Sequence, residues 1–275
     1  MRERILTTKE IKVFQGQIYG YYTLHGRDFP WRRTTNPYSI VVSEVMLQQT
    51  QVERVHRKYT EFINVLPDFD TLARASQKDV LTIWQGLGYN RRALALKRIA
   101  ENVVSIHGGV LPHDVRTLSS LPGIGKTTAG AILAFAFNIP SVFIETNIRR
   151  VYIHEFFDGE DDVKDADILP LVEATVDGQN PREWYWALMD YGSMLQGKVV
   201  NPNRRSAHYS RQTPFEGSDR RIRGLVLKRL LNHMPLSVEI LVKETGASVD
   251  RLKLILVCLV NEGFICEDNG LYKIV

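Results

Sequence analysis

The stretch Leu118-Ser-Ser-Leu-Pro-Gly-Ile-Gly-Lys-Thr-Thr-Ala-Gly-Ala-Ile132 decides the fold, because it places a tight turn between two helical segments. Pro122 and Gly123 end the first segment, and Gly125 permits the close backbone path into the second. Backbone N–H groups at Gly123, Gly125 and Lys126 then lie unpaired at a helix N-terminus, where they attract an anion. The Lys126 side chain adds a positive charge. We therefore predict that this hairpin contacts phosphate; the alternative is a plain turn between helices.

Composition limits the class of protein around this hairpin. The chain has 275 residues, of which 44% are hydrophobic and 24% are charged, as in an ordinary soluble globular protein. No run approaches the roughly 20 apolar residues of a membrane span. The start, Met1-Arg2-Glu3-Arg4, lacks the apolar stretch of a secretory signal, so we expect a cytoplasmic, nucleoid-associated protein. The only cysteines, Cys258 and Cys266, cannot form a four-thiolate metal site and are expected to be free thiols.

The positive charge is unevenly distributed. The net charge is only +4, yet the segment from Lys198 to Arg229 carries nine Lys and Arg residues against two acids, Glu216 and Asp219. Such a local surplus attracts phosphate, although a solvated surface could also carry it. The distribution therefore favours nucleic acid as a partner.

The apolar spacing predicts a mainly α-helical chain. Helices are expected at residues 8–24, 39–62, 79–84, 91–106, 128–137, 147–157 and 182–195. Residues 201–218 are polar and basic and are expected to form a linker. Residues 219–275 then predict a winged-helix-like domain, with helices at 220–233, 238–245 and 249–262 and a hairpin turn at Asn269-Gly270. The helix at 249–262 is apolar, so packing on the main domain is the alternative to entering a DNA groove.

Several strings along the chain resemble those of helix–hairpin–helix (HhH-GPD) DNA glycosylases, most closely the adenine-specific MutY-type branch. They are Phe29-Pro-Trp-Arg32, Pro37-Tyr38, Ser43-Glu-Val-Met-Leu-Gln-Gln-Thr-Gln-Val52, Trp84-Gln-Gly-Leu-Gly-Tyr89, the hairpin, Asn147-Ile-Arg-Arg-Val151 and Met189-Asp-Tyr-Gly192. The resemblance implies a two-lobed helical glycosylase domain over residues 1–200. One lobe would hold the N-terminal helices with residues 150–200, and the other, about 30–145, would contain the hairpin.

Two carboxylates are the candidate catalytic groups. Cleaving a purine N-glycosidic bond needs a proton for the leaving base and negative charge near the developing sugar cation. Glu44 lies in an apolar and amide-rich stretch, where burial would raise its pKa and keep it protonated. It matches the family's catalytic glutamate; the alternative is a carboxylate paired with backbone amides at a helix N-terminus. Glu145 stands where the family carries an aspartate, so its charge sits one methylene further out.

The resemblance also implies DNA contacts. Gln48 and Gln49 match residues that wedge into the duplex or contact the displaced strand, and Tyr89 matches a residue that contacts the opposite base, with core packing as its alternative. Arg149 and Arg150 are expected to pair with phosphate or with Glu145. The full set of expected DNA contacts is Gln48, Gln49, Tyr89, Gly123, Gly125, Lys126, Thr127, Arg149, Arg150, Arg204 and Arg205.

Several positions differ from the family's motifs, and these differences restrict the type of glycosylase reaction that we expect. Bifunctional relatives carry a nucleophilic lysine where this chain has Thr127, and Lys126 is turned away by about 100° of helix, so hydrolysis without strand cleavage is expected. No iron–sulfur loop follows Gly192; the basic segment 196–205 is expected to replace it by packing and phosphate contact. We also expect the winged-helix-like residues 219–275 to stand in place of the C-terminal domain with which relatives inspect oxidised guanine. The resemblance further implies a monovalent cation at the hairpin carbonyls, which no side chain there requires.

The leading functional hypothesis is therefore a monomeric, monofunctional glycosylase acting on double-stranded DNA. It would extrude a mismatched or damaged base and hydrolyse its glycosidic bond, with adenine opposite 8-oxoguanine or guanine as the first candidate. The alternatives are a glycosylase for thymine or uracil opposite guanine, or a lesion-binding protein without catalysis.

Overall fold

The computed structural model describes residues 4–210, 214–232 and 235–275, which form two compact units. One unit comprises residues 1–45 and 111–211, and the other comprises 46–110 and 212–275. Residues 1–3, Arg211 of the basic segment and His233 at the end of an expected helix lie outside the described residues. Within the described part, no helix is both long and apolar enough to cross a membrane.

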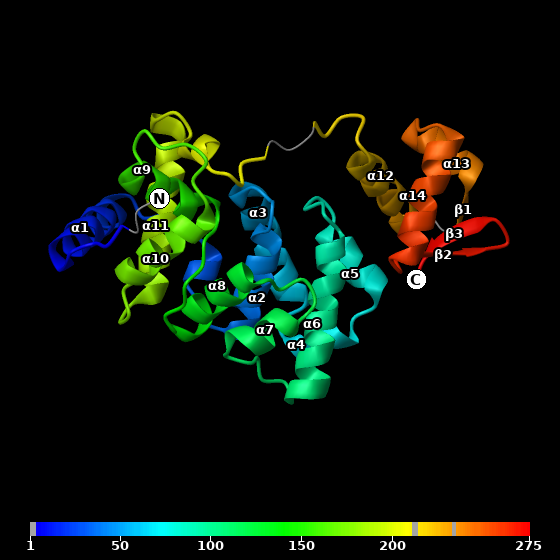
Figure 1. Ribbon diagram of the computed structural model, residues 1–275. Coiled ribbons are helices and arrows are strands. Elements are labelled where there is room, and N and C mark those ends of the chain that lie inside the picture. The colour runs from blue at the N-terminus through cyan, green and yellow to red at the C-terminus, as the bar shows by residue number, and fades with distance from the viewer. Residues whose placement is uncertain (1–3, 211–213, 233–234) are drawn as a thin grey trace. The chain divides into compact units, whose positions relative to one another are not determined.

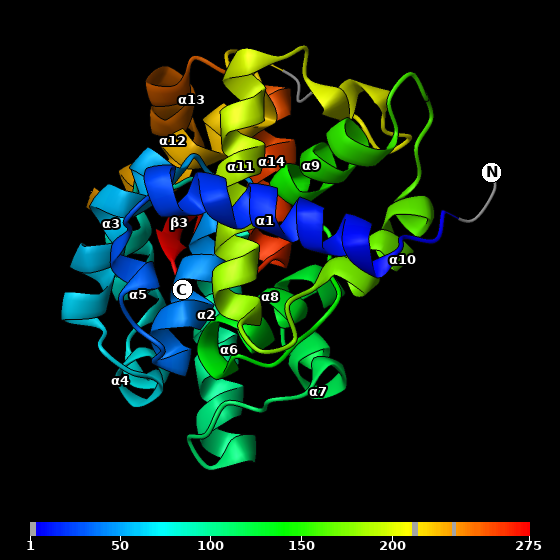
Figure 2. The ribbon, with the colours of Figure 1, turned by 90° about the vertical axis from the view of Figure 1, so that its left-hand side faces the viewer.

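The first unit is a helical assembly that includes the hairpin. Its core brings together α1, α9, α10 and α11, and Figure 2 shows α1 crossing α11. On α1, Phe14 and Ile18 are buried, and the Phe14 ring meets those of Tyr152 and Trp184 edge to face. The elements are α1 (Thr8–His25), a 3₁₀ turn (Pro30–Arg32), α2 (Pro37–Leu47), α7 (Val115–Ser120), α8 (Lys126–Phe137), α9 (Thr146–Phe156), α10 (Asp165–Thr175), α11 (Pro181–Lys198) and a second 3₁₀ turn (Pro202–Arg205).

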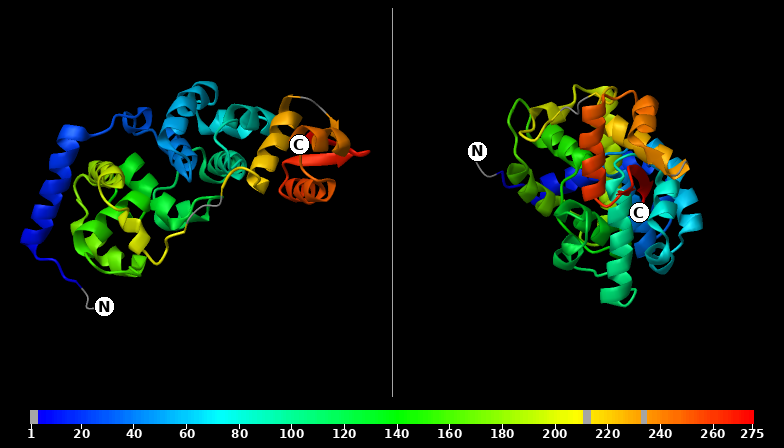
Figure 3. Two further views of the ribbon diagram at one scale, coloured as in Figure 1. Left: turned by 90° about the horizontal axis from the view of Figure 1, so that it is seen from above. Right: turned by 90° about the vertical axis from the view of Figure 1, so that its right-hand side faces the viewer.

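The second unit combines four helices with the C-terminal module. The helices are α3 (Val52–Val65), α4 (Phe69–Arg74), α5 (Gln77–Trp84) and α6 (Arg91–His107). The module contains α12 (Asp219–Asn232), β1 (Leu236–Ser237), α13 (Val238–Thr245), α14 (Val249–Asn261), β2 (Ile265–Asp268) and β3 (Leu271–Ile274), seen together in Figures 1 and 3. Its strands form one antiparallel sheet in the order β1-β3-β2.

The module has the helix and strand order expected of a winged helix. Asn269 and Gly270 both have positive φ (52° and 78°), which fits the tight turn predicted between β2 and β3. The module contacts the rest of its unit through α12 and the end of α14: Gln77 donates to the Gly263 carbonyl (2.8 Å), and Arg91 pairs with Glu262 (2.6 Å). The middle of α14 exposes Leu254 and Val257 to solvent. The buried apolar side chains of α14 therefore lie on the side of the helix that packs on α12, α13 and β2 within the module.

One expectation from the sequence is corrected. The single helix expected at 39–62 is two helices, α2 and α3, separated by a turn in which Gln49 has a φ of 53°. The hairpin at 121–126 belongs to the same unit as α1 and α9–α11, while residues 46–110 group with the C-terminal module. Packing accounts for the place of the hairpin in this unit, because α8 is buried from Ala129 to Ala136 and lies against α11.

Candidate active site

Glu44 lies on α2 in an apolar setting. Its neighbours Val41, Val45 and Ile40 are at most 1% exposed, while the Glu44 side chain itself is only partly exposed. Burial, and after it the charge of Glu145, raise its pKa to about 8, while Arg32 acts in the opposite direction. Among the described residues no hydrogen bond holds the Glu44 carboxyl. Glu44 therefore keeps its proton at neutral pH and can deliver it to a ligand.

Glu145 is held very differently, because it caps α9. One carboxylate oxygen accepts from the backbone N–H of Asn147 (2.7 Å) and of Ile148 (2.8 Å), and the other accepts from the Asn147 side chain (3.3 Å). Burial raises its pKa, and the two N–H groups together with Arg150 and Arg149 act against that rise. The amide pairing considered for Glu44 thus occurs at Glu145. These bonds favour the ionised form of Glu145 beside a protonated Glu44.

Arg149 and Arg150, in the first turn of α9 after Glu145, both bind other residues of the protein. Arg150 is 3% exposed and donates to the Asn147 side-chain oxygen (2.8 Å) and to the Gly192 carbonyl (2.7 Å). Arg149 makes two hydrogen bonds of 2.7 Å to Asp165. Both side chains thus have partners within the protein, Arg150 at the start of α9 and Arg149 at the start of α10. The expected phosphate contacts stay predictions.

Asp190 on α11 links the string Met189–Gly192, to which it belongs, with the string Phe29–Arg32. Sequence analysis did not single it out. Arg32 binds it through two hydrogen bonds of 2.8 Å, and Arg27 adds a third of 2.7 Å. Burial tends to raise the Asp190 pKa, but Arg32 and Arg27 lower it overall, so Asp190 is ionised. Both strings can be recognised in the sequence, and that was the available signal. The ion pair between Arg32 and Asp190 spans more than 150 residues, so no local pattern predicts it. Asp190 balances the charge of Arg32, the cation that lowers the Glu44 pKa.

The hairpin lies between α7 and α8 as the sequence predicts. Gly123 has a φ of 76°, and the Ile124 N–H donates to the Leu121 carbonyl (3.1 Å), which closes the turn. Gly125 caps α8 without a side-chain hydrogen bond, and Lys126 is exposed. The helix N-terminus therefore presents backbone N–H groups and a positive side chain to solvent, which suits an anion.

Thr127 and the basic segment 196–205 also belong to the first unit. The Thr127 hydroxyl donates to the Ile144 carbonyl (3.4 Å), directly before Glu145. Arg205 donates to the carbonyls of Ile153 (3.2 Å) and Phe157 and so satisfies the end of α9, whereas Arg204 is exposed. The segment therefore packs on α9 as expected. Among the described residues, no group of three or more His, Cys, Asp or Glu side chains is placed to hold a metal ion.

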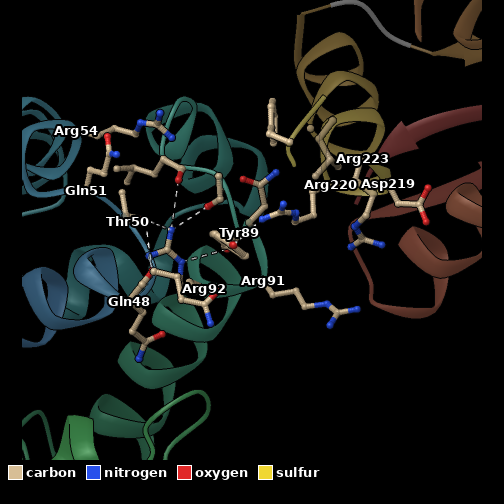
Figure 4. A pocket seen from close by; sticks show the side chains of 17 residues that line it. Gln48, Thr50, Gln51, Arg54, Tyr89, Arg91, Arg92, Asp219, Arg220 and Arg223 are labelled. Atoms are coloured by element: carbon tan, nitrogen blue, oxygen red, sulfur yellow. Dashed lines mark hydrogen bonds between the residues drawn. The ribbon is translucent and has the colours of Figure 1, made fainter. Parts of the chain in front are cut away.

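Arg92 orders the turns that carry Gln48, Gln49 and Tyr89 in the second unit. Its buried guanidinium donates to the carbonyls of Met46 (2.7 Å) and Gln48 (2.6 Å), and it reaches the Thr50 hydroxyl (2.9 Å). Figure 4 shows it lying between the two turns. Burial lowers its pKa to about 10, so it stays charged at neutral pH. Sequence reasoning missed Arg92, because its partners Met46, Gln48 and Thr50 are more than 40 residues away.

Comparisons with known proteins identify the family of this chain. A family model described as HhH-GPD superfamily base excision DNA repair protein matches residues 42–168. The chain is 30% identical to the thymine/uracil-DNA glycosylase of Methanothermobacter thermautotrophicus over 193 residues, which cover 69% of this chain and 87% of that protein. The chain therefore belongs to the HhH-GPD superfamily.

Adenine DNA glycosylases are also among the relatives. The chain is 36% identical to that of Buchnera aphidicola subsp. Baizongia pistaciae over 66% of this chain, and 35% identical to that of Homo sapiens over 68%. It spans about half of the former (53%) and about a third of the latter (36%). Among solved structures, a thermostable thymine-DNA glycosylase aligns with a TM-score of 0.62 and 28% identity, covering 68% of this chain and 87% of that one.

Proposed function

We propose that the protein is a monofunctional DNA N-glycosylase, and the contrast between Glu44 and Glu145 is the observation that carries the proposal. Both carboxyls are buried enough for their pKa values to rise, yet only Glu145 accepts backbone N–H groups. A pair of acids whose surroundings differ in this way provides one proton donor and one anion at the same pH.

The reaction follows from these two states. With a base extruded from the duplex, Glu44 donates its proton to the leaving base as the N-glycosidic bond breaks. The Glu145 carboxylate stabilises the positive charge that develops on the sugar. Water then adds its hydroxyl to the anomeric carbon and returns a proton to Glu44, leaving a free base and an abasic sugar. No strand cleavage is expected, because Thr127 supplies no amine nucleophile.

We propose adenine opposite 8-oxoguanine or guanine as the substrate, supported by the resemblance to adenine DNA glycosylases. Thymine or uracil opposite guanine is the second candidate, and the relative of which this chain covers 87% favours it. We also propose that the segment 196–205, docked on α9 by Arg205, does the packing that an iron–sulfur loop does in relatives.

A substrate panel tests the proposal. Duplexes with adenine opposite 8-oxoguanine or guanine, and thymine or uracil opposite guanine, are incubated with excess protein and then treated with alkali. Glu44→Gln should lower base release by about 10²–10⁴-fold. Glu173→Gln, which removes an exposed carboxylate from α10, is the matched control and should leave the rate unchanged. Base release unchanged in Glu44→Gln would exclude Glu44 as the acid, and cutting without alkali would contradict hydrolysis alone.

A further inference from the structure

A cavity of about 900 Å³ lies within the second unit, where the turns that carry Gln48 and Tyr89 meet the first part of α12 (Figure 4). Arg220, Arg223 and Phe215 form the wall contributed by the C-terminal segment. The matched family model ends at residue 168, so this wall is not part of it. We propose that the cavity binds a guanine of the DNA, read by Arg220.

The cavity wall offers many hydrogen-bond donors and almost no acceptor carboxylate. Five arginines line it: Arg54, Arg91, Arg92, Arg220 and Arg223. The only acid in the lining, Asp219, is already paired with Arg251 through contacts of 2.7 and 2.8 Å. An occupant that fits this wall must therefore present acceptors.

Arg220 is positioned by the family part of the chain. Its Nη1 donates to the Tyr89 hydroxyl (2.9 Å), and its guanidinium carbon lies 6.0 Å from the centre of the Tyr89 ring. Tyr89 is in turn placed by Arg92, whose guanidinium carbon lies 5.5 Å from the same ring. Nearby, Arg223 and Arg91 both bind Glu262, which joins the module to α6. A fork held in this way has few conformations to lose on binding.

Guanine is the base whose edge matches an arginine fork. Its major-groove edge carries two neighbouring acceptors, N7 and O6, whereas adenine offers one acceptor and one donor and cytosine offers a donor. The cavity also has aromatic surface on which a base can stack, since Tyr89 lines it and Phe215 is 58% exposed. The inference rests on the proposed function in one respect: extruding a base leaves its partner unpaired, and that partner is the guanine in question.

Binding measurements on uncleavable DNA test the site without catalysis. Duplexes carry a tetrahydrofuran abasic analogue opposite guanine, inosine, 7-deazaguanine, adenine or cytosine, and Kd is measured by fluorescence anisotropy at fixed salt. Inosine keeps both N7 and O6, whereas 7-deazaguanine lacks N7. Wild type should bind the guanine and inosine duplexes on the order of tenfold more tightly than the others.

Three variants identify the group responsible. Arg220→Ala should abolish the preference, and Arg220→Lys should weaken it while keeping the charge, because an ammonium lacks the planar fork. Lys243→Ala, which removes an exposed cation from the same module, should keep the preference. Wild type without a preference would overturn the inference. So would a loss of affinity in Arg220→Ala that is equal for all five duplexes, since that result would indicate phosphate contact only.

Base release distinguishes failure of the site from failure of the proposed function. A guanine preference that depends on Arg220, in a protein that releases no base from any duplex, would uphold the site and refute the glycosylase. Base release by a protein without a guanine preference would uphold the glycosylase and refute the guanine site. Circular dichroism of each variant, together with retained affinity of Arg220→Lys for the adenine and cytosine duplexes, excludes a simple loss of folding.

Discussion

Replacing Glu44 with glutamine should stabilise the folded protein, and the gain should grow with pH. A pKa raised from 4.5 to about 8 corresponds to about 5 kcal/mol of free energy favouring the protonated carboxyl. The folded state therefore binds a proton that the unfolded state releases above its own pKa. Stability contributed by the protonated form is complete below pH 4.5 and is lost as pH rises toward 8.

Glutamine resembles the protonated side chain and has no proton to release. The difference in unfolding free energy between Glu44→Gln and wild type should be close to zero at pH 4.5 and increase by about 1.4 kcal/mol per pH unit. It should reach about 3 kcal/mol at pH 7 and level off above pH 8 near 5 kcal/mol. These are upper values, because part of the Glu44 side chain reaches solvent.

Urea denaturation at pH 5, 6, 7, 8 and 9, followed by tryptophan fluorescence, measures this difference directly. Glu173→Gln removes an exposed carboxylate from the same unit and should show no comparable growth with pH. A constant difference between wild type and Glu44→Gln over pH 5–8 would refute the raised pKa. The assignment of Glu44 as a proton donor at neutral pH would then fail with it.

Three further outcomes follow from the contacts. Asp190→Asn removes the ionised partner of the buried Arg32 and should lower the unfolding free energy by about 3–5 kcal/mol, measured in urea. Arg92→Leu frees the carbonyls of Met46 and Gln48; it should weaken binding to abasic DNA while the far-ultraviolet spectrum, which reports helix content, stays unchanged. Lys126→Ala should weaken DNA binding equally for all sequences and reduce the slope of log K against log salt by about 1; an unchanged slope would place Lys126 away from phosphate.

Features specified by neighbouring residues could be predicted from the sequence. The turn at Asn269-Gly270 needs positive φ at both residues, and Asn and Gly adopt it readily, so the pattern is sufficient by itself. The buried helix α8 was equally clear from its run of small and apolar side chains. The hairpin before it follows from Pro122 and Gly123, whose backbone preferences act locally.

Features that depend on distant partners could not be predicted. The break between α2 and α3 has no proline or glycine; it is held by Arg92, which binds the carbonyls on the α2 side from 44 and 46 residues away. Helix α10 contains Pro170, which is unfavourable inside helices, and so its pattern was not recognised. The cavity at Arg220 needed the packing of α12 beside Tyr89, and no spacing in the sequence encodes that.

The extra methylene at Glu145 matters less than side-chain length alone suggests, because α9 places the carboxylate. Two backbone N–H groups fix one oxygen within 2.8 Å, and the positive end of the helix favours its charge. An aspartate at an N-cap position can accept from the same N–H groups. Glu44 has no such donors among the described residues. The contrast in protonation between the two carboxyls therefore depends on the donors that surround each one.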